Sequence, residues 1–279
     1  MTGSCQLIVN ADDLGWAVGR DRGIFNCIEH GIVTSVSLMA NGGTFDAAVA
    51  ELQQHDVGIG VHLNLADGQA LVGPIRGLTD DNGQFYGKQQ SRESFITGCF
   101  DLQQVRIELC AQLQRVLETG VTVDHLDSHQ HMFLFPRLTP VLIELCQQFA
   151  IGATRLPLAV DHVTAEVQPQ LWDELCMYRH YSNEFRRRLA ATDVFMPQGL
   201  LGMPLLNRLN VETLVPSLYQ LSTGCWELMV HPGDQDAGQE FCGVERQLEQ
   251  HALTSRKVCQ VIERCGVQLT TFGAAACTS

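Results

Sequence analysis

The chain has 279 residues, of which 45% are hydrophobic and 18% are charged, and its formal net charge is −13 at pH 7. This length fits one large α/β domain or two small ones, and the composition provides enough apolar side chains for a sizeable core. The negative charge argues against a nucleic-acid partner, which needs clustered Lys and Arg, and no apolar run approaches the roughly 20 residues of a membrane span.

The thiols and the amino terminus predict a cytoplasmic protein. Eleven cysteines are scattered along the chain without a CxxC pair, and their odd number favours reduced thiols over a disulfide framework. The first residues, "MTGSCQLIVNADD", lack the basic and apolar regions of a secretory signal. The densest basic cluster, Arg186 to Arg188, is short and indicates a solvated helix face.

The first part of the chain alternates strand-like and helix-like segments. Short apolar runs bounded by polar residues predict buried parallel strands at Gln6–Asn10, Val33–Asn41 and Val57–Leu65. Helical patterns lie between them at Gly23–His30 and Phe45–Gln54. Residues 68–98 are the least regular part, and their glycines and Pro74 predict a loop or lid inserted after the third strand.

The pattern continues after this insertion. Asp101 is the expected N-cap of a helix with an apolar stripe from Leu102 to Leu117. Further strands are predicted at "VTVDHLDSH", "ATRLP", "CWELMVH" and "VQLTTF", with helices at Leu138–Phe149 and Ser255–Cys265. Repeated β–α units imply a parallel sheet, and about seven of them fit a TIM-like (β/α) barrel better than a doubly wound sheet. No linker divides the chain, so residues 1–279 are expected to form a single domain.

Polar side chains follow several of these strands. Asp12 and Asp13 follow the first, His62 and Asn64 lie at the end of the third, Arg155 lies in "ATRLP", and His231 ends "CWELMVH". Function in parallel α/β folds gathers where strands end and loops begin. We therefore expect these side chains to share one site.

The stretch "VDHLDSHQH" is the densest group of titratable residues. His125, Asp127, His129 and His131 are each two residues apart, so an extended strand would place all four on one side, with His125 and His131 roughly 20 Å apart. His129 is then the best ligand, Asp127 and His131 would support it or contact substrate, and His125 would lie deeper. A helix would instead pair His125 with His129, but the upstream "VTV" favours the strand.

Each residue also has a purely structural interpretation. Asp12 and Asp13 would serve as helix caps, His62 alone would be a core histidine, and His231 before Pro-Gly would be a turn residue. The Asp67-Gly68 pair is best explained as a turn. Taken together, however, Asp13, His62 and His129 match a two-His-one-carboxylate site that holds one divalent metal ion and leaves open positions.

The stretches "LIVNADDLG", "GIVTSVSLMAN", "VGIGVHLNL", "DHLDSHQHMFLFP", "TRLP" and "ELMVHPG" run in this order from Leu7 to Gly233. Together they resemble the YdjC-like carbohydrate deacetylases, which include chito-oligosaccharide and hopanoid-associated deacetylases. The resemblance implies a distorted (β/α) barrel and removal of an N-acetyl group from an acetylated amino sugar, with release of acetate. The chain departs from the family pattern at Leu14, where Phe is usual, and it matches weakly from Ala165 to Leu218.

The same resemblance implies roles for individual residues. Asp13, His62 and His129 would bind the metal, Asp12 would be the catalytic base, and His231 the acid. Arg155 would orient Asp12 or hold a sugar hydroxyl. The ligand set suits zinc, whereas the family points to magnesium. A small N-acetylated sugar is the expected partner, and a homodimer is an assembly common among such barrels.

Two other functions stay open at this point. A metal-dependent sugar isomerase or epimerase on a similar barrel would commonly use more carboxylate ligands, and Glu is missing from the predicted strand ends. A non-catalytic sugar-binding barrel would lack a base or a ligand, whereas Asp12, Asp13, His62 and His129 are all present.

Overall fold

The computed structural model describes residues 4–160, 169–235 and 241–278. In these ranges seven strands form one sheet, in which every pairing is parallel. The strands are β1 (Cys5–Leu14), β2 (Ser35–Leu38), β3 (Gly58–Leu63), β4 (His125–Ser128), β5 (Leu200–Leu201), β6 (Gly224–Val230) and β7 (Val267–Thr270).

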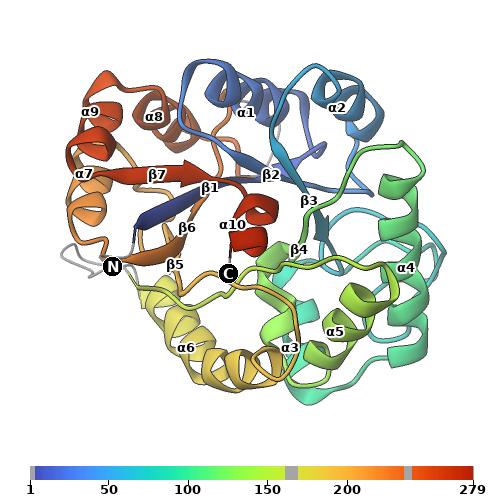
Figure 1. Cartoon of the computed structure of the whole chain (residues 1–279). Helices are drawn as coiled ribbons and strands as arrows, with labels where there is room; N and C mark the ends of the chain where they lie inside the picture. The colour runs from blue at the N-terminus through green and yellow to red at the C-terminus, as the bar shows by residue number, and fades with distance from the viewer. Residues whose placement is uncertain (1–3, 161–168, 236–240, 279) are drawn as a thin grey trace.

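Helices surround the strands, as Figure 1 shows. They are α1 (Val18–His30), α2 (Phe45–Leu52), α3 (Lys88–Thr97), α4 (Leu102–Leu117), α5 (Thr139–Gln148), α6 (Pro169–Leu189), α7 (Val211–Tyr219), α8 (Val244–Leu253), α9 (Arg256–Arg264) and α10 (Phe272–Thr278), with a 3₁₀ segment η1 (His129–Leu134) directly after β4. The side chains of Arg186 and Arg187 are exposed near the end of α6, as predicted for a solvated helix face.

The strand order is β4-β3-β2-β1-β6-β5. β1 is long enough to pair with β7 along its first half and with β2 along its second half, while β6 lies on its other side. Isolated parallel bridges, Leu126 with Thr154 and Ala159 with Leu200, link β4 towards β5. The predicted distorted (β/α) barrel of parallel strands is therefore confirmed. The predicted strand "ATRLP" is wrong in detail, because this segment forms single bridges and Pro157 has no N–H to continue a ladder.

The core lies between the strands and the helices around them. β2, β3 and β4 are buried along their whole length, as expected for a parallel sheet covered on both faces. The apolar stripe of α4 is confirmed, since Val105, Leu109, Leu113 and Val116 are buried. Its N-cap is also confirmed, because the side chain of Asp101 accepts hydrogen bonds from the backbone N–H groups of the first turn.

The irregular segment after β3 is packed against the barrel. Antiparallel bridges join Gln69 to Gln84 and Thr79 to Phe85, and Ile75, Leu78 and Phe85 are buried in the main core. The end of this segment is not a loop, since Lys88 begins helix α3. That the chain is a single domain with a lid at residues 68–98 stays a prediction.

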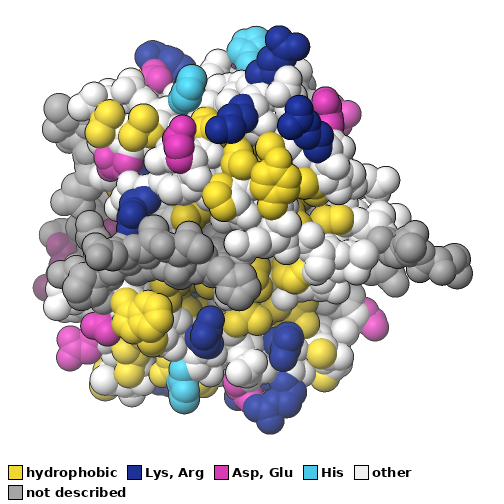
Figure 2. Space-filling model, turned by 90° about the vertical axis from the view of Figure 1, so that its left-hand side faces the viewer, with side chains coloured by type: hydrophobic (Ala, Val, Ile, Leu, Met, Phe, Trp, Pro, Cys, Tyr) yellow, Lys and Arg dark blue, Asp and Glu magenta, His cyan; other side chains and the backbone are white. Residues whose placement is uncertain are grey.

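The surface and the helices bear on two classes of partner. On the face shown in Figure 2, Lys and Arg side chains are dispersed, with Asp and Glu side chains among them, and hydrophobic side chains lie in several separate groups. Within the described ranges, no helix combines the length and apolar character needed to cross a membrane. The absence of a nucleic-acid partner stays a prediction.

Candidate active site

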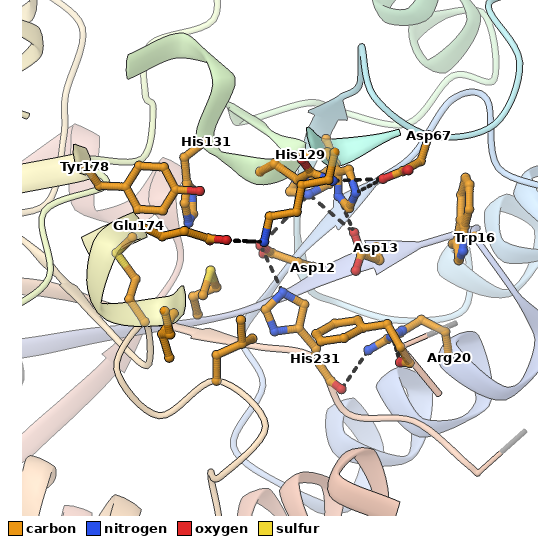
Figure 3. Close-up of a pocket in the computed structure, with 18 of the residues that line it drawn as sticks. Asp12, Asp13, Trp16, Arg20, Asp67, His129, His131, Glu174, Tyr178 and His231 are labelled. Atoms are coloured by element: carbon orange, nitrogen blue, oxygen red, sulfur yellow. Dashed lines mark hydrogen bonds and ion pairs between the residues drawn. The ribbon is translucent and has the colours of Figure 1, made fainter. Parts of the chain in front are cut away.

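The end of β1 brings two consecutive aspartates into one pocket. Asp13 has a φ of +66°, and the register between β1 and β2 shifts between Ala11 and Leu14. Consecutive residues of a regular strand point to opposite faces, but this left-handed residue changes the direction, so that Asp12 and Asp13 both line the pocket (Figure 3). The alternative that they cap the next helix is wrong, because the N-cap of α1 is Ala17.

Asp13 lies beside two histidines from other strand ends. The Oδ1 atom of Asp13 is 3.0 Å from Nδ1 of His129 and 3.4 Å from Nε2 of His62. One ligand atom from each of the three residues lies within 4.8 Å of the others. Two imidazole nitrogens and one carboxylate at this separation fit a single divalent cation with open coordination positions. The expected clustering of these three residues is thus present in the structure.

Each of the two histidines has a second carboxylate on its other ring nitrogen. The Oδ1 atom of Asp127 is 2.8 Å from Nδ1 of His62, and the Oδ2 atom of Asp67 is 2.7 Å from Nε2 of His129. Such outer carboxylates fix the tautomer and the orientation of metal-binding histidines. Asp127 was expected near the ligands, whereas Asp67 was interpreted as a plain turn residue. Nothing in the local sequence distinguishes Asp67 from a turn aspartate.

Asn64 shapes the turn that presents Asp67. Its side-chain amide donates to the backbone carbonyl of Asp67 at 2.6 Å, and its Oδ1 accepts from the backbone N–H groups of Ala66 and Asp67. Asn64 is fully buried and does not line the pocket. Asn64 was expected at the site, and the structure places it behind the pocket, where it supports the turn of Asp67.

The strand that carries the histidine-rich stretch ends earlier than predicted. β4 stops at Ser128, and Gln130 and His131 have φ values of +54° and +55° within η1. The predicted strand Val121–His129 is therefore shorter, and the extended conformation considered for His125 to His131 does not hold beyond Ser128. The chain turns after Ser128, so that His129 contacts Asp13 and His131 points into the pocket. The ring centroids of His131 and Tyr178 are 5.2 Å apart.

His125 lies away from this cluster. It is fully buried and stacks on Phe272 at 4.0 Å between ring centroids. Its Nδ1 lies 2.6 Å from Asp124, and its Nε2 lies 3.3 Å from the hydroxyl of Ser37. The helical alternative, in which His125 and His129 bind one metal, is wrong, because His125–Ser128 forms a strand and His125 is not among the residues whose ligand atoms cluster with His129.

Arg155 organises the buried side of the site. Its guanidinium donates to both carboxylate oxygens of Asp12, at 2.7 and 2.6 Å, and it also contacts Asp127 at 3.0 Å and Glu227 at 2.8 Å. Arg155 is 2% exposed and does not line the pocket. This position suits the orientation of Asp12, and the contact of Arg155 with a sugar hydroxyl stays a prediction.

The charges around Arg155 keep Asp12 ionised. Burial alone would raise the pKa of Asp12, but Arg155 and His62 outweigh burial and lower it. Glu227, which sequence reasoning missed, is fully buried on β6, and burial raises its pKa to about 7 even beside Arg155. Asp12 is therefore ionised near neutral pH, and of the three carboxylates around Arg155 it is the one that lines the pocket.

His231 follows β6 and lies across the pocket from the histidine cluster (Figure 3). Its Nε2 atom is 3.8 Å from Oδ2 of Asp12. Burial lowers the pKa of His231 to about 3, although Asp12 and Asp13 oppose this shift. His231 is therefore a neutral imidazole at the start of any reaction near neutral pH, and it has to receive a proton before it donates one.

The pocket beside these residues has two kinds of wall. Its volume is about 370 Å³. One side carries the aspartates and histidines together with Asp67 and Gln130. Other parts of the lining are apolar and come from α6, the segment after β5, β6 and Phe241: Leu171, Leu175, Met203, Leu206, Met229 and Phe241. The ion pair between Lys88 and Glu174 and the ring of Tyr178 also line the pocket. Such a pocket suits a ligand with a polar reacting group and an apolar face.

Metal binding should depend on pH, because the ligand histidines hold protons in the metal-free protein. Burial would lower the pKa of His129, but Asp13 and Asp67 outweigh it and raise the pKa to about 10. A cation must displace this proton. Below pH 10 the apparent affinity should therefore rise with pH, by about tenfold per pH unit for each proton released. Calorimetric titration in two buffers of different ionisation enthalpy, from pH 6 to pH 8, measures the number of protons released on metal binding. An affinity that does not change with pH would contradict the prediction.

Replacing Asp67 should weaken metal binding. Asp67→Ala removes the carboxylate that orients His129 and attracts the cation, so we expect an affinity lower by about tenfold to a hundredfold. Calorimetric titration with Zn²⁺ measures the change. Asp81→Ala is the matched control, because Asp81 is an exposed aspartate of the same segment. An Asp67→Ala affinity equal to that of the control would show that Asp67 does not support His129.

Comparison with known proteins shows the family to which the chain belongs. The family model described as "YdjC-like protein" matches residues 6–264. A carbohydrate deacetylase of Mus musculus is 32% identical over 293 residues, which cover 95% of this chain and 93% of the relative. A chitooligosaccharide deacetylase of Proteus mirabilis is 32% identical over 272 residues, with 95% and 97% coverage.

The fold also matches solved structures. An Enterococcus faecalis protein named for cellobiose-phosphate cleavage has a TM-score of 0.76 at 24% identity, covering 96% of this chain and 98% of that protein. A peptidoglycan N-acetylglucosamine deacetylase has a TM-score of 0.50 at 10% identity, with 99% and 91% coverage. At these identities the structural matches establish the fold alone. The family match covers nearly the whole chain, and the predicted resemblance is confirmed: the chain belongs to the YdjC-like family.

Proposed function

We propose that this protein is a metal-dependent carbohydrate deacetylase, which hydrolyses the N-acetyl group of an acetylated amino sugar and releases acetate. One observation carries the proposal. A two-His-one-carboxylate cluster lies within 4.8 Å in a pocket that also contains Asp12, a base held ionised by Arg155. The relatives of Mus musculus and Proteus mirabilis, which this chain matches over most of their length, are named as deacetylases of carbohydrates.

The metal would be held by Asp13, His62 and His129. When bound, a divalent cation supplies Lewis acidity towards the amide carbonyl and makes water more acidic. Zinc and magnesium are both part of the proposal, because the nitrogen ligands suit zinc and the family suggests magnesium.

The remaining steps belong to side chains of this chain. Asp12 accepts a proton from the attacking water, since its carboxylate is ionised and faces the pocket. The departing amine needs a proton, and His231 lies 3.8 Å from Asp12. A neutral His231 balances the protons if it accepts the proton from Asp12 and donates it to the amine nitrogen. His131 and the apolar wall remain to contact the substrate.

Three further properties belong to this proposal. A cytoplasmic location is supported by the eleven cysteines, all of which are free thiols. The substrate would be a small N-acetylated sugar, as an oligosaccharide or a glycoconjugate, because the pocket combines a polar end with an apolar wall. A homodimer is proposed from its frequency among such barrels.

The test is an acetate-release screen over N-acetylglucosamine oligomers, conjugates and lipid-linked forms, with and without a chelator. We expect acetate release that the chelator stops and that added Zn²⁺ or Mg²⁺ restores. An isomerase or epimerase would change the sugar without releasing acetate, and a sugar-binding protein would bind without any product. Either result, or acetate release that the chelator leaves unchanged, would overturn the proposal.

A further inference from the structure

Beyond the residues that face the reacting atoms, we propose that Arg20, Arg246 and Glu249 are positioning residues, which hold His231 against Asp12 through its backbone. This inference rests on the proposed function for the role of His231. It concerns side chains of α1 and α8 that no motif of the sequence singled out. Arg20 lines the pocket, whereas Arg246 and Glu249 do not.

Both backbone groups of His231 are bound by charged side chains. The N–H of His231 donates to Oε1 of Glu249 at 2.7 Å, and its carbonyl accepts from Arg20 at 2.8 Å and from Arg246 at 3.4 Å. Arg246 and Glu249 pair with each other at 3.0 Å. Figure 3 shows the contact between Arg20 and the His231 carbonyl. Because β6 ends at Val230, these groups have no partner in the sheet and need others.

The charged side chains are as deeply buried as the core. Arg20 is 1% exposed, Arg246 is 0% and Glu249 is 3%. Among the described residues, no carboxylate lies within ion-pair distance of Arg20, which donates instead to the carbonyls of His231 and Phe241. Burying charged groups costs free energy that neutral partners would avoid. Strong, charge-assisted hydrogen bonds that fix one backbone position account for their presence.

The side chain of His231 is restrained as well. The ring of Phe241 lies 5.2 Å from the His231 ring at 81° between planes. Phe241 is itself flanked by two guanidinium groups, with Arg20 at 5.0 Å and Arg246 at 4.2 Å from its ring centroid. The same two arginines therefore fix the backbone of His231 and the ring against which its side chain packs.

Close packing of α1 brings Arg20 to this position. Asp234 N–H donates to the carbonyl of Gly19 at 2.8 Å, and a Cβ at Gly23 would overlap the backbone of Gly233. The glycines let α1 lie directly on the His231-Pro232-Gly233 turn. On the other side, Gly233 N–H donates to the carbonyl of Arg246 at 3.3 Å. The turn is thus held between α1 and α8, and a displacement of either helix moves His231.

The first test is Arg20→Lys, which keeps the charge but cannot donate to two carbonyls in the planar fork of arginine. We expect kcat to fall by about tenfold to a hundredfold, because a shift of the His231 ring by up to about 1 Å would misplace it relative to the reacting atoms. KM and metal content should stay unchanged. Arg22→Lys is the matched control, because Arg22 lies two residues away on α1 with an exposed side chain.

A double-mutant cycle with His231→Gln separates positioning from a general structural effect. If Arg20 acts through His231, adding Arg20→Lys to His231→Gln should cause no further loss of kcat. An equal loss in both backgrounds, or a kcat of Arg20→Lys equal to that of the control, would overturn the inference. Should Arg20→Lys fail to fold, Glu249→Gln enters the same cycle, because it removes the charge at the His231 N–H while keeping an acceptor.

A readout without substrate keeps this test independent of the proposed function. In ¹⁵N-histidine spectra of the metal-free protein, the His231 signals are those missing from His231→Gln. Arg20→Lys should shift them while the signals of His62 and His129 stay in place, and unshifted His231 signals would contradict the inference. A protein that releases no acetate would end the proposed function, and this spectral result would still decide whether Arg20 positions His231.

Discussion

His129→Ala should abolish metal uptake and reduce acetate release to the background rate. His129 supplies one of three ligand atoms, and its removal leaves Asp13 and His62 without the third donor that a cation site of this type needs. The fold should survive, because the His129 side chain is 20% exposed and its removal leaves a gap open to the pocket. Elemental analysis measures the metal, and the thermal transition reports the fold.

His125→Ala is the matched control from the same stretch of sequence. Its ring is fully buried, stacks on Phe272 and is hydrogen-bonded to Asp124 and Ser37. We expect this variant to keep its metal but to lose about 3 kcal/mol of unfolding free energy, the usual cost of removing a buried aromatic ring. Equal metal loss from both variants would contradict the prediction that His129 is a metal ligand and His125 is not.

Sequence reasoning located the metal ligands because they obey a simple geometric rule. The carboxyl ends of parallel strands meet at one end of a barrel, so polar residues after separate strands become neighbours. Asp13 after β1, His62 on β3 and His129 after β4 follow this rule. The buried strands and the capped helix at Leu102–Leu117 were predictable for a different reason, because each depends on the local pattern of apolar and capping residues.

Local backbone geometry was not predictable in the same way. A period of two residues assumes an extended chain, yet Asp13, Gln130 and His131 adopt left-handed conformations. These are uncommon for residues other than glycine and depend on the surrounding structure. They bring Asp12 and Asp13 to the same pocket and turn His131 into it, so these residues reach the expected site through turns and not along an extended strand.

Contacts between distant segments were also beyond sequence reasoning. Asp67 looks like any turn aspartate until Asn64 and His129 are seen around it. Glu227 lies in an ordinary strand pattern and Arg20 in an ordinary helix pattern. Only the structure shows that both are buried, that Glu227 accepts from Arg155 and that Arg20 donates to the carbonyl of His231. With a single sequence, no local signal marks such residues.

The adjacent aspartates should respond differently to the same chemical change. Asp13→Asn removes the anionic ligand, so metal affinity and activity should fall together, and added metal should partly restore both. Asp12→Asn should keep the metal, because no ligand atom changes, and should keep the fold, because Arg155 retains Asp127 and Glu227 as partners. Metal content of the two variants, measured side by side, separates a ligand from a base.

For Asp12→Asn we expect kcat to fall by about 10²–10⁴-fold with a modest change in substrate binding, as for the loss of a general base. The slowdown should be similar at every pH above 5. The pKa of Asp12 is lowered, so the wild-type carboxylate is ionised in this range and becomes protonated only at lower pH. Rates of acetate release between pH 5 and pH 9 measure this pH dependence.

An Asp12→Asn enzyme that turns over like wild type would remove Asp12 from the mechanism. Asp127 would be a poor substitute, since His62, Ser37 and Arg155 already occupy its oxygens, and His131, which lines the pocket, would be the base to test next.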